Sequence, residues 1–115
     1  MDLSKWKLSA KMKTLAEELL YQAMLKGHDV RITSGLRTQA EQNTLYAQGR
    51  TAPGKIVTWT TNSKHIGGNA IDICFNGNNP YPTNFNWEKL GVIGEELGLR
   101  WGGRFKAKDN VHFEI

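Results

Sequence analysis

His65 and Asp72 bound the segment that most constrains how this chain folds, His-Ile-Gly-Gly-Asn-Ala-Ile-Asp. The residues that follow its glycines are mostly apolar and predict an extended strand over 70–75. Alternation along a strand places Asp72 on one face and Ile71 and Ile73 on the other face, toward a core. A carboxylate in that position is costly to bury unless a metal ion or a hydrogen-bond donor accompanies it. The segment therefore predicts a strand that packs through one face and carries a polar site on the other.

The end of the chain supplies further residues for this site. Residues 111–115 predict a strand in which His112 and Glu114 share one face, so Glu114 can accept a hydrogen bond from the histidine ring and fix its tautomer. Asp109 lies three residues before His112 and cannot share that face by alternation. However, Asp109-Asn110 is a turn pair, which lets the chain bend and bring the Asp109 carboxylate toward the same place.

Two histidines and one carboxylate match the donors that catalytic zinc prefers. Such sites use three protein ligands and leave the fourth position to water. His65, Asp72 and His112 are therefore candidate ligands for one Zn²⁺ per chain, and Asp109 is a candidate base for the water. The residue types alone leave a plainer alternative open, in which the histidines are solvated or satisfied in a core and Asp109 is an ordinary turn residue.

Helices and strands are expected to alternate along the chain. Apolar residues repeat at helical spacing over 9–26, between the candidate caps Ser9 and Gly27, which predicts a helix. A capping box over residues 38–41 begins a second helix that ends near residue 48. The other expected elements are a helix over 87–97, strands over 29–33, 70–75 and 111–115, and a loop over 50–63 with a short strand at 56–57.

Composition limits the classes of protein to which the chain can belong. It has 115 residues, the size of one domain, and its single cysteine, Cys74, excludes an intrachain disulfide. No apolar stretch approaches transmembrane length, and lysines interrupt the region where a signal peptide needs a continuous apolar run. The net charge of +4 favours an anionic partner, such as nucleic acid, anionic lipid or a cell-wall polymer. Because the basic residues are scattered without a recognition motif, neither nucleic-acid binding nor membrane insertion is expected.

Four segments resemble those of a known family of zinc peptidases. Residues 63–72 resemble the Ser-x-His-x-x-Gly-x-Ala-x-Asp motif of peptidase family M15, which includes the VanY- and VanX-type D-Ala-D-Ala peptidases. Residues 109–114 look like the closing motif of that family, and residues 34–38 are similar to its Ser-Gly-aromatic-Arg-Ser/Thr segment. Residues 45–58 are similar to one branch in particular, the L-alanyl-D-glutamate endopeptidases of phage endolysins and related bacterial wall hydrolases. The resemblance runs from residue 30 to the end of the chain.

The resemblance implies a fold and a ligand set. It implies an α+β fold in which helices flank a small antiparallel sheet, the zinc peptidase fold of D,D-peptidases and hedgehog domains. It implies zinc on His65, Asp72 and His112, and Asp109 as the general base and then the general acid. It also implies that residues 1–115 form a single catalytic domain, with no separate wall-binding domain.

Other residues are expected to act on the substrate side. The resemblance implies that Arg37 polarises the scissile carbonyl and that Ser63 lies near the substrate. Trp59, in the loop before the site, is the tryptophan best placed to touch substrate. The role of Glu114 is left open: it either supports a metal ligand or takes part in catalysis. Residues 102–105 read Gly-Gly-Arg-Phe where the endopeptidase branch often has Gly-Gly-Asp-Trp, so contacts to substrate there are in question.

The expected function is hydrolysis of the L-Ala–D-Glu bond in bacterial peptidoglycan, by a monomer, in endolysin-type lysis. The chain is expected to be made in the host cytoplasm without a signal peptide and to act on the wall after release. A D-Ala-D-Ala carboxypeptidase is the alternative within the family. A non-catalytic zinc-binding domain that recognises the wall is the alternative from another class, and the presence of Asp109 and Arg37 argues against it.

Overall fold

The computed structural model describes residues 2–115, which form three α-helices, four β-strands and three short 3-10 helices. The α-helices are α1 (Ala10–Leu25), α2 (Gln39–Ala47) and α3 (Glu88–Glu96). The strands are β1 (Val30–Ser34), β2 (Ala70–Phe75), β3 (Arg100–Trp101) and β4 (His112–Glu114), and the 3-10 helices are η1 (Ser4–Trp6), η2 (Lys64–Gly67) and η3 (Gly102–Arg104). Among residues 2–115, no helix has both the length and the hydrophobicity needed to cross a bilayer.

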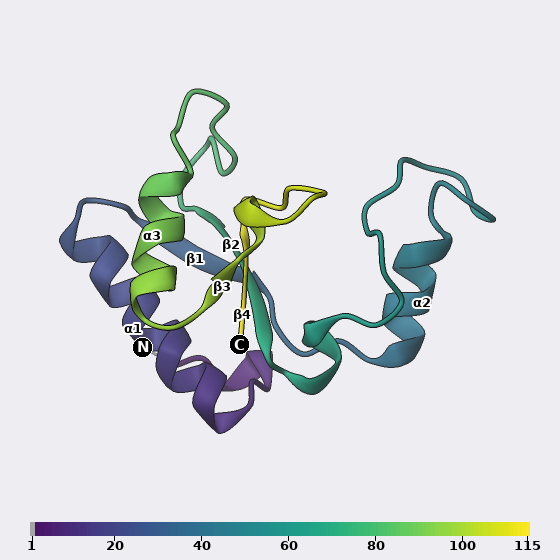
Figure 1. Ribbon diagram of the computed structural model, residues 1–115, viewed down its shortest axis with the longest axis horizontal. Helices are drawn as coiled ribbons and strands as arrows, with labels where there is room; N and C mark the ends of the chain where they lie inside the picture. Colours follow the sequence, from purple (N-terminus) through teal and green to yellow (C-terminus); the bar gives the residue numbers. More distant parts are fainter. Residues whose placement is uncertain (1) are drawn as a thin grey trace.

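One antiparallel sheet with the strand order β1-β2-β4-β3 forms the centre of the molecule. Helices α1 and α3 pack against each other and against this sheet, on the left of Figure 1. Helix α2 and the loop over residues 48–63 form an arm that projects on the right (Figure 1). The predicted α+β fold, a small antiparallel sheet flanked by helices, is therefore confirmed.

The hydrophobic core lies between the sheet and the two helices α1 and α3. Apolar residues at helical spacing on α1 face the apolar side of the sheet, as the amphipathic pattern predicts. Among the described residues, the arm contributes none to this core. The fully buried members include Met12, Ala16, Leu19 and Ala23 from α1, Ile71, Ile73 and Phe113 from the sheet, and Leu90 from α3.

Strand pairing aligns the polar residues of β2 and β4 on the face away from the core. Asp72 lies opposite His112, and Ala70 lies opposite Glu114. The register of β1 against β2 shifts after Ile32, which places Ser34 opposite Asp72 as well. Because residues paired across a ladder share one face of the sheet, these side chains meet where the helices do not cover them.

The boundaries of the α-helices and longer strands largely agree with the sequence, and two short strands differ. The Ser9 side chain caps α1 by accepting from the Met12 N–H, and the capping box of α2 is formed, so both helix starts are confirmed. The short strand predicted at 56–57 is wrong, because these residues lie in the exposed loop, and no strand among residues 2–115 pairs with them. The sequence also missed β3, which is only two residues long and cannot show an alternating pattern.

Gly91 on α3 lies where a side chain would enter the ring of Trp101. A Cβ atom on Gly91 would come 2.2 Å from Trp101 Cδ2. We expect Gly91→Ala to lower the free energy of unfolding by about 1–3 kcal/mol, because overpacking outweighs the helix preference of alanine, roughly 1 kcal/mol. Denaturant unfolding measures this change. Lys89→Ala, at an exposed position of the same helix, should stay within about 0.5 kcal/mol of the wild-type value. Equal stability of Gly91→Ala and the wild-type protein would contradict this packing.

Candidate active site

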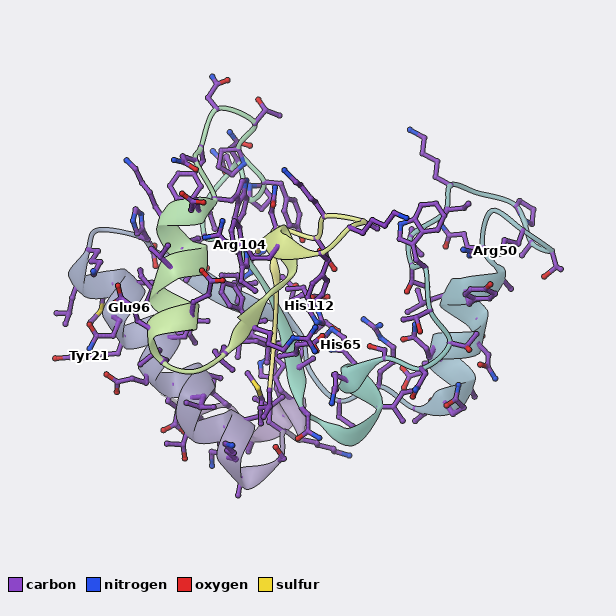
Figure 2. The ribbon with its side chains drawn as sticks, viewed as in Figure 1. Tyr21, Arg50, His65, Glu96, Arg104 and His112 are labelled. Carbon is purple, nitrogen blue, oxygen red and sulfur yellow. The ribbon has the colours of Figure 1, made fainter. Side chains whose placement is uncertain are left out.

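His65, Asp72 and His112 place three donor atoms within 4.8 Å of one another, although they come from η2, β2 and β4. Asp72 Oδ1 lies 3.4 Å from His65 Nε2 and 3.1 Å from His112 Nδ1. The centroids of the two imidazole rings are 5.1 Å apart. Figure 2 shows the two histidines close together, between the sheet and the arm. Both histidines are buried and Asp72 is partly exposed, so the cluster is accessible on the side of the carboxylate.

The backbone fixes the tautomer of His65. Its Nδ1–H donates to the carbonyl oxygen of Gly35 at 2.8 Å. Because a carbonyl can only accept, the ring proton lies on Nδ1, and Nε2 keeps a free lone pair directed toward Asp72. The His65 N–H donates to Ser63 Oγ at 3.1 Å, so the serine side chain caps η2 and orients the histidine.

His112 lies between two carboxylates. Its Nε2–H donates to Glu114 Oε1 at 2.8 Å, and Glu114 Oε2 accepts from Arg100 Nη1 at 3.2 Å. Burial alone would lower the pKa of His112, but its hydrogen bonds to Asp72 and Glu114 outweigh burial and raise the pKa. With Glu114 accepting from Nε2, the Nδ1 atom of His112 is the one that faces the cluster.

Asp72 is an anion held between the two histidines. Burial alone would raise the pKa of its carboxyl group, yet hydrogen bonds to His112 and His65 hold the pKa below its usual value. The guanidinium of Arg37 adds a positive charge on the other side, with Nη2 at 3.9 Å from Asp72 Oδ2. Two imidazoles and an ionised carboxylate on adjacent segments form a donor set for a divalent cation.

Gln42 positions Arg37, and sequence reasoning missed it. The Gln42 side chain is fully buried on α2, where its Oε1 accepts from Arg37 Nη1 at 2.7 Å. Its Nε2 donates to the carbonyl oxygen of Thr60 at 2.6 Å, which ties the loop of the arm to the same amide. The only signal in the sequence is helical spacing, since Gln42 lies three residues before Leu45, on the face of α2 that turns toward the cleft.

Asp109 reaches the cluster from a turn rather than from a strand. Its N–H donates to the carbonyl oxygen of Gly102 at 2.9 Å, and its carbonyl accepts from the His112 N–H at 3.1 Å. The chain therefore bends at Asp109-Asn110, as the turn pair predicts. Desolvation in the cleft and the negative charge of Asp72 raise the pKa of the Asp109 carboxyl group. A raised pKa suits a carboxyl group that takes up and releases a proton.

A cleft of about 660 Å³ lies over the cluster, and its walls come from different parts of the chain. The arm supplies one wall, with Trp59 and the apolar residues before it. The segment after η3 supplies the other, with Phe105 and Asp109. All the residues that the sequence singled out line this cleft, namely Arg37, Trp59, Ser63, His65, Asp72, Asp109, His112 and Glu114.

Comparisons with known proteins identify the family. A family model described as D-alanyl-D-alanine carboxypeptidase, of peptidase family M15, matches residues 57–115. The peptidoglycan L-alanyl-D-glutamate endopeptidase CwlK of Bacillus subtilis (strain 168) is 38% identical over 118 aligned residues, which cover 90% of this chain and 71% of CwlK. The chain belongs to peptidase family M15. The family predicted from the motifs is thereby confirmed.

Solved structures show the fold of family M15. The L-Ala D-Glu endopeptidase ChiX of Serratia marcescens is 22% identical and superposes with a TM-score of 0.67, over 94% of this chain and 80% of ChiX. The vancomycin-resistance D,D-pentapeptidase VanY, in a complex with Zn(II), is 15% identical with a TM-score of 0.68, over 94% of this chain and 72% of VanY. At these identities the likeness concerns the fold alone.

Arg104 stands where the endopeptidase branch of family M15 often has aspartate. Its side chain does not line the cleft, so it adds no charge there. Arg104 donates to Glu88 at 2.7 Å and to Glu95 at 3.1 Å, both on α3. Its guanidinium lies 4.9 Å from the centre of the Trp101 ring. Arg104 thus ties η3 to α3, while its neighbour Phe105 lines the cleft with its ring centroid 5.8 Å from that of His112.

Proposed function

We propose that the chain is a zinc peptidase that hydrolyses the L-Ala–D-Glu bond of peptidoglycan stem peptides. The observation that carries this proposal is the His65–Asp72–His112 cluster, with Asp109 and Arg37 beside it in one cleft. The choice of bond is supported by CwlK, the 38% identical relative that is named for this activity. Likeness over residues 45–58 to the same branch supports it independently of the ligands.

The donor set fits zinc. Tetrahedral bonds of roughly 2.0 Å separate neighbouring donor atoms by about 3.3 Å. Asp72 Oδ1 lies 3.1 Å from His112 Nδ1 and 3.4 Å from His65 Nε2, close to that spacing. Each histidine uses its remaining ring nitrogen in a hydrogen bond, to Gly35 or to Glu114, which is the support that metal-binding imidazoles have in proteins. We therefore assign one zinc ion per chain to these three residues.

Zinc bound in such a site would act as a Lewis acid and would lower the pKa of a bound water molecule toward neutrality. Asp109 takes a proton from the water that attacks the carbonyl carbon of the L-Ala residue, and then gives this proton to the amine of the leaving D-Glu residue. Arg37, held by Gln42 and Ser34, donates to the carbonyl oxygen as negative charge develops there. Glu114 holds the His112 ring and does not need to exchange a proton.

Peptidoglycan is the proposed partner, and the basic surface of the chain suits this anionic polymer. The proposal includes endolysin-type lysis, in which a monomer made in the host cytoplasm reaches the wall after release. It includes neither nucleic-acid binding nor membrane insertion.

Mass spectrometry of digested peptidoglycan tests the bond. We expect stem peptides with a new amino-terminal D-Glu and no release of free D-Ala. The second candidate, a D-alanyl-D-alanine carboxypeptidase, rests on the description of the matching family model. Release of D-Ala without new D-Glu termini would establish that candidate and refute the endopeptidase.

Glu114 should control how tightly zinc binds. Glu114→Ala removes the acceptor for His112 Nε2–H, and loss of such a partner typically weakens metal binding by about 10- to 100-fold. Competition with a chromophoric chelator measures the affinity. Glu114→Gln keeps an acceptor oxygen and should lose less. Glu96→Ala, at an exposed position of α3, is the matched control and should bind zinc as the wild-type protein does. Unchanged affinity in Glu114→Ala would contradict the supporting role.

A further inference from the structure

The wall of the cleft on the arm exposes large apolar side chains that the proposed chemistry does not use. Trp59 is 68% exposed, and its neighbours Ile56 and Val57 are 41% and 55% exposed. All three line the cleft that contains the metal cluster. Exposed apolar surface that continues into a site marks a region that contacts ligand.

The Trp59 ring lies in a group of side chains on the arm that contact one another. The guanidinium carbon of Arg50 lies 3.8 Å from the centre of the Tyr46 ring and 5.6 Å from the centre of the Trp59 ring. Arg50 Nη1 donates to the carbonyl oxygen of Tyr46 at 2.6 Å. Figure 2 places Arg50 on the arm, across from His65 and His112. We call Tyr46, Arg50 and Trp59 the aromatic platform.

Hydrogen bonds within the loop hold the chain beside the platform. The Gly49 N–H donates to the carbonyl oxygen of Ala52 at 2.9 Å, and Gln48 Nε2 donates to that of Lys55 at 3.0 Å. Gly49 has φ +80°, and a Cβ atom there would come 2.7 Å from the Ile56 nitrogen. Only glycine allows this close approach, so the backbone carries the apolar residues into the cleft wall in a defined position.

We infer that the aromatic platform binds the sugar next to the scissile bond, an N-acetylated muramyl residue of the glycan strand. The inference rests on the proposed function, because in peptidoglycan the nitrogen of L-Ala is joined to muramic acid through a lactyl group. The sugar must therefore lie within one residue of the carbonyl that reacts, and Trp59, one member of the platform, lines the same cleft.

The chemistry of the platform matches a sugar better than a peptide side chain or a second protein. The flat face of Trp59 fits the apolar C–H face of a pyranose ring. Arg50 makes no ion pair with any residue from 2 to 115, and its remaining N–H groups suit hydroxyl and acetamide oxygens. A purely apolar partner would offer no acceptors to the N–H groups of Arg50 other than the one bonded to Tyr46.

Two substrates that differ only in the sugar test the inference. One is the disaccharide muropeptide GlcNAc–MurNAc-stem peptide, and the other is the same stem peptide with its L-Ala N-acetylated. Trp59→Ala should lower kcat/KM for the muropeptide by about tenfold, mainly by raising KM, because one aromatic contact is lost. For the sugar-free peptide the change should stay within about twofold. Trp59→Phe should keep most of the activity on the muropeptide.

Calorimetric titration with the GlcNAc–MurNAc disaccharide tests the site without catalysis. Binding should be lost in Trp59→Ala and kept in Tyr81→Ala, which removes an exposed aromatic residue outside the cleft. Equal losses on both substrates, no loss on either, or a dimer that Trp59→Ala converts to a monomer would each overturn the sugar site. If the wild-type protein cleaves neither substrate at L-Ala–D-Glu, the proposed function fails, and the titration alone then decides the sugar site.

Discussion

Asp109→Ala should lower kcat for L-Ala–D-Glu cleavage by roughly 100- to 10,000-fold, the range that a general acid–base group contributes. The carboxyl group lies on a turn at the edge of the His65–Asp72–His112 cluster, and its pKa is raised by desolvation and by the charge of Asp72. It contributes no ligand to the cluster, so zinc content should not change. Release of new D-Glu termini from purified peptidoglycan measures the rate, and elemental analysis measures the metal.

The control for this variant is Lys106→Ala, an exposed position in the same segment. It should keep the wild-type rate. This result would show that activity is lost in Asp109→Ala because the carboxylate is missing, and not because a substitution in this segment disturbs the turn. Asp109→Asn preserves the size of the side chain and should be as inactive as Asp109→Ala. Wall lysis by Asp109→Ala at the wild-type rate would show that another group moves the proton.

His65→Ala should abolish both zinc binding and activity. The variant removes Nε2, one of the three donors, and loss of Nδ1 also leaves the Gly35 carbonyl without its partner. Zinc per chain, measured after dialysis, should fall to near zero, and kcat/KM should fall to the uncatalysed background. His112→Ala should behave in the same way.

The third histidine of the chain provides the control for the ligand variants. His28 packs edge-on against Phe85 and does not line the cleft, so His28→Ala should keep zinc and activity. If His65→Ala fails to fold, removal of zinc from the wild-type protein with a chelator, followed by its return, gives the same comparison. Full zinc content in a folded His65→Ala protein would refute the ligand set.

The strand register explains why the candidate ligands could be picked out from the sequence. Alternation placed Asp72 and His112 on polar faces of their strands, and the structure pairs these residues directly across β2 and β4. The turn at Asp109-Asn110 was visible because these residue types favour turns. Motifs and local patterns therefore predicted the residues on the side of the cleft that lies on the sheet.

The arm was much harder to predict from the sequence. The loop over residues 48–63 has no period, and its bonds reach distant residues, as from Gln42 to Thr60. A glutamine on a helix is ordinarily expected at the surface, so nothing local shows that Gln42 is buried and holds Arg37. Ile56 and Val57 favoured a strand by residue type, yet none of the strands in the described part of the chain pairs with them.

The arm adds no residue to the hydrophobic core among the residues that the structure describes, although it builds one whole wall of the cleft. The free energy that keeps the sheet folded therefore comes from residues other than those that meet the substrate on this side. We expect substitutions of the exposed side chains of residues 55–59 to change what the enzyme accepts at little cost in stability. Changes in β2 and β4, by contrast, would affect the candidate ligands and the core together, because Asp72 and His112 alternate with Ile71, Ile73 and Phe113. Such a division lets natural variation or protein engineering direct the enzyme to a different peptidoglycan while the catalytic centre stays the same.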